Sequence, residues 1–324
     1  MKQIPRIRLA HLPTPIEPLP RLSAHLGGPR LWVKRDDQTG LAFGGNKTRK
    51  LEFVLAEAQA NGAQTLITVG GVQSNHCRQT AALAARFNLD CILVLNGDPN
   101  QAPSGNLLLD QFFGADIVWT SREQREAALQ TTFQHAWEEG KRPYLVPLGA
   151  STPLGALGYA AAFEECLQQD VVRPDWMVVA SSSGGTQAGL VLGAKLANWG
   201  GKVLGISIDQ PVGELQQTVA NLASEASILL GEKQILRPAD VLANADYLGG
   251  GYAVLGDAEV EAIRLFARYE GLLLDPVYTG RAAAGLIDLI RKGFFKPDES
   301  VLFWHTGGTP ALFADGYRAQ LTQS

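Results

Sequence analysis

Strand-like apolar runs alternate with helix-like segments along the whole chain. Short apolar runs bounded by turn residues predict strands at 31–34, 65–71, 91–95, 116–119, 143–147, 176–180, 203–208 and 301–304. The segments between them predict helices at 73–87, 105–113, 122–139, 154–168, 181–197, 211–236, 260–270 and 280–292, with a last helix beginning at 307–310. Residues 11–22 are punctuated by proline and should be extended, and residues 246–257 read as a glycine-rich loop. This order predicts an α/β fold with two open, twisted, mainly parallel sheets.

One further helix starts directly after the glycine pair Gly44-Gly45. The apolar residues of its buried face follow at i, i+3, i+4 and i+7: Leu51, Val54, Leu55 and Ala58. Lys47 falls in the first turn of this helix, where backbone N–H groups make a positive end. A positive field and partial desolvation both lower the pKa of a lysine, which makes a neutral amine nucleophile available. A lysine near a helix start is more often solvated surface, so the case for Lys47 depends on the motifs that accompany it.

Composition and charge exclude several classes of function. The chain has 324 residues, 46% hydrophobic and 19% charged, with a formal net charge of −4, which gives no electrostatic case for binding nucleic acid or an anionic membrane. No apolar stretch approaches the roughly 20 residues of a membrane span, and the N-terminal residues lack the apolar run of a signal peptide. The three cysteines and five histidines show no metal-ligand spacing. We therefore expect a cytoplasmic protein with no metal site and no nucleic-acid or membrane partner.

Glycine-rich turns are expected at the carboxyl ends of strands, where ligands bind in sheets of this kind. The turn Ser181 to Thr186 is the best candidate anion site, because small residues let backbone N–H groups close on a phosphate at a helix N-terminus. The alternative is a glycine pair that only allows close helix–sheet packing. Two nucleotide motifs fit poorly: no G-x-G-x-x-G follows a strand, and Asn46 interrupts the P-loop-like residues 40–48. A lysine in a first turn, a separate phosphate cup and hydroxyl-rich strand ends suggest a phosphorylated aldehyde cofactor held as a Schiff base.

Four motifs, in order along the chain, carry a family resemblance. They are Gly44-Gly45-Asn46-Lys47-x-Arg49-Lys50-Leu51-Glu52, Gly71-x-Gln73-Ser74-Asn75-His76-x-Arg78-Gln79, Leu274-Asp275-Pro276-Val277-Tyr278-Thr279-Gly280 and His305-Thr306-Gly307-Gly308. In these motifs the chain resembles, essentially end to end, the D-cysteine desulfhydrase and 1-aminocyclopropane-1-carboxylate (ACC) deaminase family. The resemblance implies the fold of the tryptophan synthase β-subunit, fold type II, with pyridoxal 5′-phosphate (PLP) as the cofactor.

The resemblance also implies roles for individual residues. Lys47 matches the Schiff-base lysine, and Asn75 matches the residue that hydrogen-bonds the phenolic oxygen of the cofactor. Ser74, Asn75 and Gln79 match positions near the substrate carboxylate, with Ser74 a candidate for proton transfer. Two tyrosines match positions near the reacting carbons: Tyr278 and Tyr252. The phosphate loop is matched by Ser182, Ser183, Gly184, Gly185 and Thr186.

Two threonines sort the chain within the family. ACC deaminases carry Glu after the tyrosine of D-P-V-Y and Leu before the last Gly-Gly, whereas this chain has Thr279 and Thr306, as in D-cysteine desulfhydrases. Both are expected beside the pyridine ring of the cofactor. A threonine hydroxyl leaves the ring nearer neutral than a carboxylate does, which suffices for β-elimination because the leaving group takes up the electrons. The expected reaction converts D-cysteine to pyruvate, hydrogen sulfide and ammonia, with Lys47 as the base and Tyr278 or Ser74 assisting.

Several alternatives stay open. L-cysteate sulfo-lyase, β-chloro-D-alanine elimination and ACC deamination keep PLP and change the amino-acid substrate. A non-catalytic nucleotide-binding α/β protein keeps the cleft and needs no reactive lysine. The expected organisation is a large PLP-binding domain, residues 1–47 and 161–324, with a smaller α/β domain, residues 48–160, inserted into it and the cofactor between them. The family suggests a homodimer.

Overall fold

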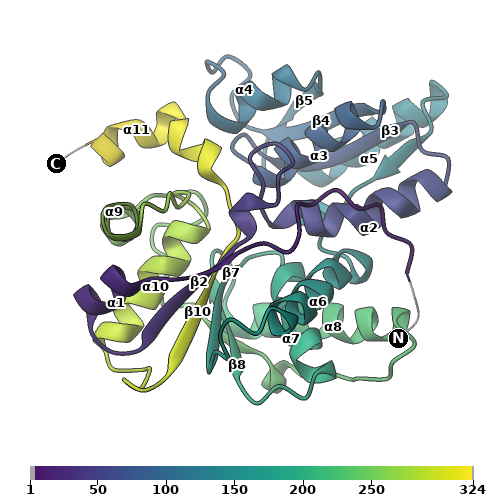
Figure 1. Ribbon diagram of the computed structural model, residues 1–324. Coiled ribbons are helices and arrows are strands. Elements are labelled where there is room, and N and C mark those ends of the chain that lie inside the picture. Colours follow the sequence, from purple (N-terminus) through teal and green to yellow (C-terminus); the bar gives the residue numbers. More distant parts are fainter. Residues whose placement is uncertain (1–3, 323–324) are drawn as a thin grey trace.

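The computed structural model describes residues 4–322, which form two open sheets (Figure 1). Within this range the six-stranded sheet has the order β1 (Ile16–Pro18), β2 (Arg30–Arg35), β10 (Ser300–His305), β7 (Trp176–Ser181), β8 (Lys202–Ser207) and β9 (Leu242–Asn244). The four-stranded sheet has the order β5 (Asp116–Thr120), β4 (Asp90–Asn96), β3 (Thr65–Gly71) and β6 (Pro143–Leu145). All of the strand pairs are parallel except β1 with β2. The expected α/β class with mainly parallel sheets is confirmed.

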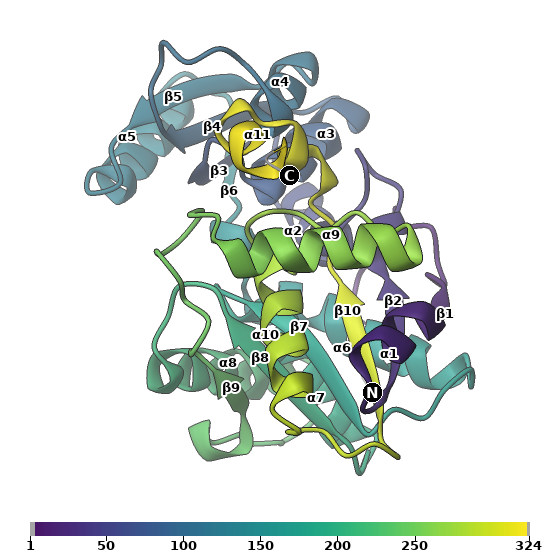
Figure 2. The ribbon, with the colours of Figure 1, turned by 90° about the vertical axis from the view of Figure 1, so that its left-hand side faces the viewer.

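Helices cover both faces of the six-stranded sheet. One face carries α1 (Pro20–Leu26), α9 (Asp257–Glu270) and α10 (Thr279–Arg291), and Figure 2 views this side with α9 in front of α10. The other face carries α6 (Pro153–Gln168), α7 (Gly185–Leu196) and α8 (Val212–Leu229). In β7, Val178 faces the first layer and Met177 and Val179 face the second. A strand buried on both faces therefore reads as a continuous apolar run, as observed.

The four-stranded sheet is covered in the same way. α2 (Asn46–Ala60), α3 (Asn75–Arg86) and α4 (Gly105–Phe112) pack on the face that carries Leu66 and Leu93. α5 (Arg125–Glu138) packs on the opposite face, against Ile67 and Val94. β3 and β4 pair over their full length, with Gly71 opposite Asn96. These two residues bring the carboxyl ends of both strands to one edge.

A few predicted elements were wrong or missed, each for a local reason. The helix predicted for residues 211–236 ends at Leu229, because Gly231 takes a positive φ of 77°. The last predicted helix starts late: a 3-10 turn (Thr309–Phe313) precedes α11 (Asp315–Thr322). Part of the predicted extended segment is helical, since Pro20 is tolerated in a first helical turn. β1 and β9 span three residues each, too short to show a period.

The helices between the two sheets bear on the proposed domain division. α2 gives Leu51 and Leu55 to the core of the four-stranded sheet and Phe53 to a core of the six-stranded sheet. α6 buries Ala156 and Leu157 in that second core, although both fall inside the predicted smaller domain. The domain boundaries at residues 48 and 160 stay a prediction. The packing of Ala156 and Leu157 favours a second boundary near the start of α6, a few residues before 160.

Two classes of feature are absent from the described residues. Between residues 4 and 322 no helix has the length and apolar character needed to cross a bilayer. The same residues contain no group of three or more His, Cys, Asp or Glu side chains arranged to hold a metal ion.

Candidate active site

A cavity of about 400 Å³ lies where strands of both sheets end. Its walls include the carboxyl ends of β3, β4 and β7 and the residue that follows β10: Gly71, Asn96, Ser181 and Thr306. Ligands of parallel α/β sheets bind at this edge. Most of the residues singled out by the motifs line the cavity: Lys47, Ser74, Asn75, Ser182, Ser183, Gly184, Gly185, Thr186, Tyr252, Tyr278 and Thr306.

Lys47 reaches the cavity from the first turn of α2. Among the described residues, no side-chain hydrogen bond or ion pair engages its ammonium group, and burial lowers the pKa of Lys47 to about 8. The preceding Gly45 has a φ of 124°, and a Cβ there would lie 2.5 Å from Gln79 Nε2. Only glycine fits this turn, which presents an unengaged amine to the cavity.

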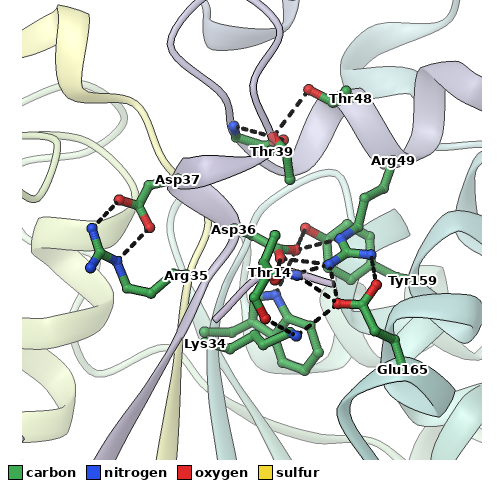
Figure 3. Close-up of polar contacts among 12 residues, drawn as sticks. Thr14, Lys34, Arg35, Asp36, Asp37, Thr39, Thr48, Arg49, Tyr159 and Glu165 are labelled. Atoms are coloured by element: carbon green, nitrogen blue, oxygen red, sulfur yellow. Dashed lines mark hydrogen bonds and ion pairs between the residues drawn. The ribbon is translucent and has the colours of Figure 1, made fainter. Parts of the chain in front are cut away.

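A buried ionic cluster holds the first turn of α2 through Arg49 (Figure 3). Arg49 donates from Nε and Nη2 to the two oxygens of Asp36 at 2.9 Å each, and from Nη1 and Nη2 to Glu165 at 2.8 and 2.9 Å. Asp36 also accepts from Tyr159 Oη at 2.6 Å and Trp304 Nε1 at 2.8 Å. Burial alone would raise the pKa of Asp36, but the charge and hydrogen bonds of Arg49 outweigh it and hold that pKa at about 2. The cluster therefore ties α2 to β10 and α6 directly behind Lys47.

The glycine turn after β7 forms an anion cradle. Gly184 adopts a φ of 77° and α7 begins at Gly185. A Cβ on Gly185 would lie 2.7 Å from Ser151 Oγ and 2.9 Å from Lys50 Nζ, so a larger residue would fill the cradle. Ser183 Oγ lies 2.7 Å from Ser151 Oγ. Small residues, a helix N-terminus and a nearby ammonium group are the features that bind phosphate.

Lys50 lies beside the anion cradle and is a further functional candidate. Its Nζ donates to Gly149 O at 3.1 Å and to Ser151 Oγ at 3.0 Å, with no carboxylate partner among the described residues. Burial, followed by the charge of Lys47, lowers the pKa of Lys50. The spacing between Lys47 and Lys50 could have indicated this role from the sequence. Residues three apart share a helix face, so both lysines point the same way. The amine of Lys47, with Lys50 and the anion cradle beside it, fits a phosphorylated aldehyde such as PLP.

The start of α3 also lines the cavity. Ser74 is the N-cap, and its Oγ accepts from Cys77 N–H at 3.2 Å, which leaves the hydroxyl hydrogen available to the cavity. Asn75 Oδ1 accepts from Arg78 Nη1 at 3.1 Å and Asn106 Nδ2 at 2.9 Å. His76 Nε2 lies 2.8 Å from Thr68 Oγ1, and burial, with the charges of Lys47 and Lys50, lowers its pKa. His76 is therefore a neutral wall of the site.

The two predicted tyrosines form a pair on the far wall. Tyr252 Oη and Tyr278 Oη lie 2.6 Å apart, with the rings edge to face at a centroid distance of 6.0 Å. Burial raises the pKa of Tyr252 to about 12, and burial together with the neighbouring Tyr252 holds the pKa of Tyr278 well above its ordinary value. Both therefore remain neutral phenols near pH 7, and one proton can lie between the two oxygens.

Two residues predicted to contact ligands lie outside the cavity lining. Gln79 is buried and donates from Nε2 to Gly44 O at 2.6 Å, so it supports the turn before Lys47. Thr279 is buried and donates from Oγ1 to Asp275 Oδ1 at 2.7 Å, and the same carboxylate accepts from the backbone N–H groups of Val277 and Thr279 at the start of α10. The ligand contacts expected of these two residues therefore stay predictions. Of the two threonines, only Thr306 reaches the cavity.

Three charged residues line the cavity although no motif singled them out: Arg122, Arg125 and Asp209. Asp209 accepts from Ser182 Oγ at 3.1 Å. Burial raises the pKa of Asp209, while this hydrogen bond and the Arg122 charge oppose the rise. All three lie in loops or at a helix start, where the sequence showed no recognisable pattern.

The model of the family described as "Pyridoxal-phosphate dependent enzyme" matches residues 7–307. The chain belongs to this family. Members of it are pyridoxal-phosphate dependent, so the expected cofactor is confirmed, and the unengaged Lys47 and the anion cradle fit it.

Relatives of this family cover almost the whole chain. D-cysteine desulfhydrases of Salmonella choleraesuis (strain SC-B67) and Salmonella typhi are 44% identical over 322 residues, which is 97% of this chain and 97% of each relative. A solved structure described as an ACC deaminase homologue is 40% identical with a TM-score of 0.89, covering 98% of this chain and 96% of its own. The recognised family is thereby confirmed.

A more distant structure shares the fold alone. Threonine deaminase isoform 2 from Solanum lycopersicum has a TM-score of 0.67 at 17% identity, covering 95% of this chain and 82% of its own. The expected fold type II is confirmed by this likeness.

Proposed function

We propose that this chain eliminates hydrogen sulfide from D-cysteine, and that water then hydrolyses the released 2-aminoacrylate to pyruvate and ammonia. The observation that carries the proposal is one cavity that brings together Lys47, the anion cradle, Ser74 and the tyrosine pair. Its near full-length similarity to D-cysteine desulfhydrases supports this choice of substrate.

Lys47, Lys50 and the 182–186 turn would hold PLP. The turn and Lys50 would bind the phosphate, and Lys47 Nζ would bind the aldehyde carbon. When bound, PLP supplies a ring that accepts the electrons released at the substrate Cα. Because burial lowers the pKa of Lys47 to about 8, its neutral fraction near pH 7 exceeds that of an ordinary lysine. Lys47 Nζ is therefore our candidate for taking the Cα proton.

The tyrosine pair is our candidate for protonating the leaving sulfur. Each hydroxyl can pass its proton to the other across 2.6 Å, and their raised pKa values keep both protonated. Ser74 Oγ retains its own hydrogen for the substrate carboxylate.

The similarity to an ACC deaminase homologue makes ACC the second candidate substrate. The purified protein should be assayed side by side with D-cysteine, L-cysteine, L-cysteate, β-chloro-D-alanine and ACC. We expect the highest kcat/KM with D-cysteine. A higher kcat/KM with ACC or L-cysteate would replace the proposed reaction by that alternative. An absence of turnover with all of them, together with an absence of bound PLP, would favour a non-catalytic nucleotide-binding protein.

We also propose that the protein is a cytoplasmic homodimer. Three buried free cysteines suit a reducing compartment. Phe112 and Phe313 are 74% and 71% exposed on α4 and on the 3-10 turn that packs against it, and large exposed apolar side chains of this kind favour an interface. Light scattering after size exclusion tests the dimer: a monomer mass would contradict it, and Phe112→Ser with Phe313→Ser should weaken a real interface.

A further inference from the structure

Arg78 is a buried cation that joins two parts of the site without lining the cavity itself. Its Nη1 donates to Asn106 Oδ1 at 2.7 Å and to Asn75 Oδ1 at 3.1 Å, and its Nη2 donates to Gly44 O at 2.9 Å. Gly44 belongs to the turn that leads into Lys47, whereas Asn75 begins α3. One planar guanidinium group therefore spans the two segments that carry Lys47 and Asn75.

The contacts of Asn75 decide which way its side-chain amide faces. Oδ1 accepts from Arg78 Nη1 and from Asn106 Nδ2, and only the amide oxygen can accept from donors. The amide nitrogen lies on the other side, where a Cβ on Gly308 would approach it to 2.7 Å. Because Asn75 lines the cavity, this orientation offers an N–H donor, not a carbonyl, to a ligand oxygen.

The charge of Arg78 is directed at neutral acceptors. Its two charged neighbours, Asp110 and Asp275, do not hydrogen-bond the guanidinium, and both Asp110 oxygens lack a hydrogen-bond partner among the described residues. Burial lowers the pKa of Arg78 to about 10 and raises that of Asp110 to about 8. A charge-assisted hydrogen bond polarises the accepting amide, so the N–H group of Asn75 becomes a stronger donor.

We propose that Arg78 is a positioning residue, which acts on the bound cofactor through the Asn75 amide and on Lys47 through the Gly44 carbonyl. The inference rests on the proposed function and on the role that the family resemblance implies for Asn75, as the partner of the phenolic oxygen of PLP. Without the guanidinium group, the Asn75 amide is free to turn and the Gly44 turn loses one of its anchors. Cofactor binding should then weaken although every residue that contacts the cofactor is still present.

The test compares Arg78→Met and Arg78→Lys with the matched control Arg86→Met, which places the same change on an exposed position of the same helix. Three quantities are measured for each purified variant: the dissociation constant of PLP, the visible absorption band of the loaded protein, and the thermal midpoint without PLP. We expect Arg78→Met to raise the dissociation constant by about 10- to 100-fold, the equivalent of one charge-assisted hydrogen bond, and to shift the band. Arg78→Lys should fall in between, because an ammonium group keeps the charge but not the planar fork.

A double-mutant cycle with Asn75→Ala separates positioning from general destabilisation. Asn75→Ala should cost less PLP affinity in the Arg78→Met protein than in the wild type, because one effect acts through the other. Fully additive losses, or a wild-type band and affinity in Arg78→Met, would overturn the inference. Should Arg78→Met fail to fold, the same cycle with Arg78→Lys decides. A wild-type protein that binds no PLP would instead refute the proposed function.

Discussion

At the scale of single residues, the main feature of the site is two lysines, Lys47 and Lys50, that pair with no carboxylate among the described residues. Lys47 and Lys50 lie in one helical turn, and the pKa of each is lowered by burial, with the charge of Lys47 acting also on Lys50. Two adjacent ammonium groups that have no carboxylate partner within residues 4–322 repel one another and are costly to bury. A bound phosphate relieves this cost beside Lys50, and a bond from Lys47 to an aldehyde carbon relieves it at Lys47.

Gly185→Asp tests the anion cradle. The new side chain would crowd the cradle, because its added Cβ would lie 2.7 Å from Ser151 Oγ, and its charge would oppose a phosphate. We expect the dissociation constant of PLP to rise by about 100-fold or more. Gly200→Asp is the control, because Gly200 is exposed and its added Cβ meets no atom within 4 Å. Unchanged PLP occupancy in Gly185→Asp at dilute cofactor would place the phosphate elsewhere.

Thr306 and Thr279 should behave differently when substituted. Thr306→Leu removes a hydroxyl group that lines the cavity, and we expect the ratio of kcat/KM for D-cysteine to that for ACC to fall by about 10-fold or more. Thr279→Glu would instead bury a carboxylate beside that of Asp275, so its main effect should be a loss of stability, seen as a lower thermal midpoint. A stable Thr279→Glu protein with changed substrate preference would mean that Thr279 does reach the ring.

At the scale of elements, the start of α2 is held by the Asp36 cluster. Arg49, Tyr159 and Trp304 bind Asp36 from three elements that are distant in the sequence. Because the carboxylate is fully buried, its charge is tolerated only with these partners in place. The cluster therefore fixes the helix whose first turn presents Lys47.

The free energy of unfolding should decrease at low pH because Asp36 becomes protonated. Its pKa in the folded protein is about 2 against an ordinary 3.8, so its stabilisation is complete above about pH 4 and is lost as the pH falls through 2. The difference corresponds to about 2 kcal/mol. Asp36→Asn should lower the free energy of unfolding at pH 7 by about 3–5 kcal/mol in denaturant titrations, since it removes one of the two carboxylates that pair with the buried Arg49 and leaves Glu165 as the other.

Asp170, which forms an exposed ion pair with Arg173, provides the control for Asp36→Asn. Asp170→Asn removes a carboxylate that is 73% exposed and 3.6 Å from Arg173, and surface pairs contribute little. We expect its free energy of unfolding to match that of the wild type within about 0.5 kcal/mol. Equal and small losses for both variants would contradict the role given to the cluster.

At the scale of the whole molecule, the sequence predicted what local patterns encode. The strand–helix order and the glycine turn at 181–186 follow from apolar runs and small residues, and Lys47 follows from its place in a first turn. The orientations of the Gln79 and Thr279 side chains could not be predicted from the sequence, because tertiary contacts set them. Gln79 donates to Gly44 O, and Thr279 donates to the Asp275 carboxylate. Arg122 and Asp209 reach the cavity only through the tertiary arrangement of loops.

The central claim is that Lys47 binds the cofactor covalently. The most direct measurement is borohydride reduction of the PLP-loaded protein, followed by peptide mapping of the pyridoxyl group. The account predicts the label on Lys47, and no label or turnover in a folded Lys47→Ala protein. A label on Lys50 or Lys34 instead would contradict it.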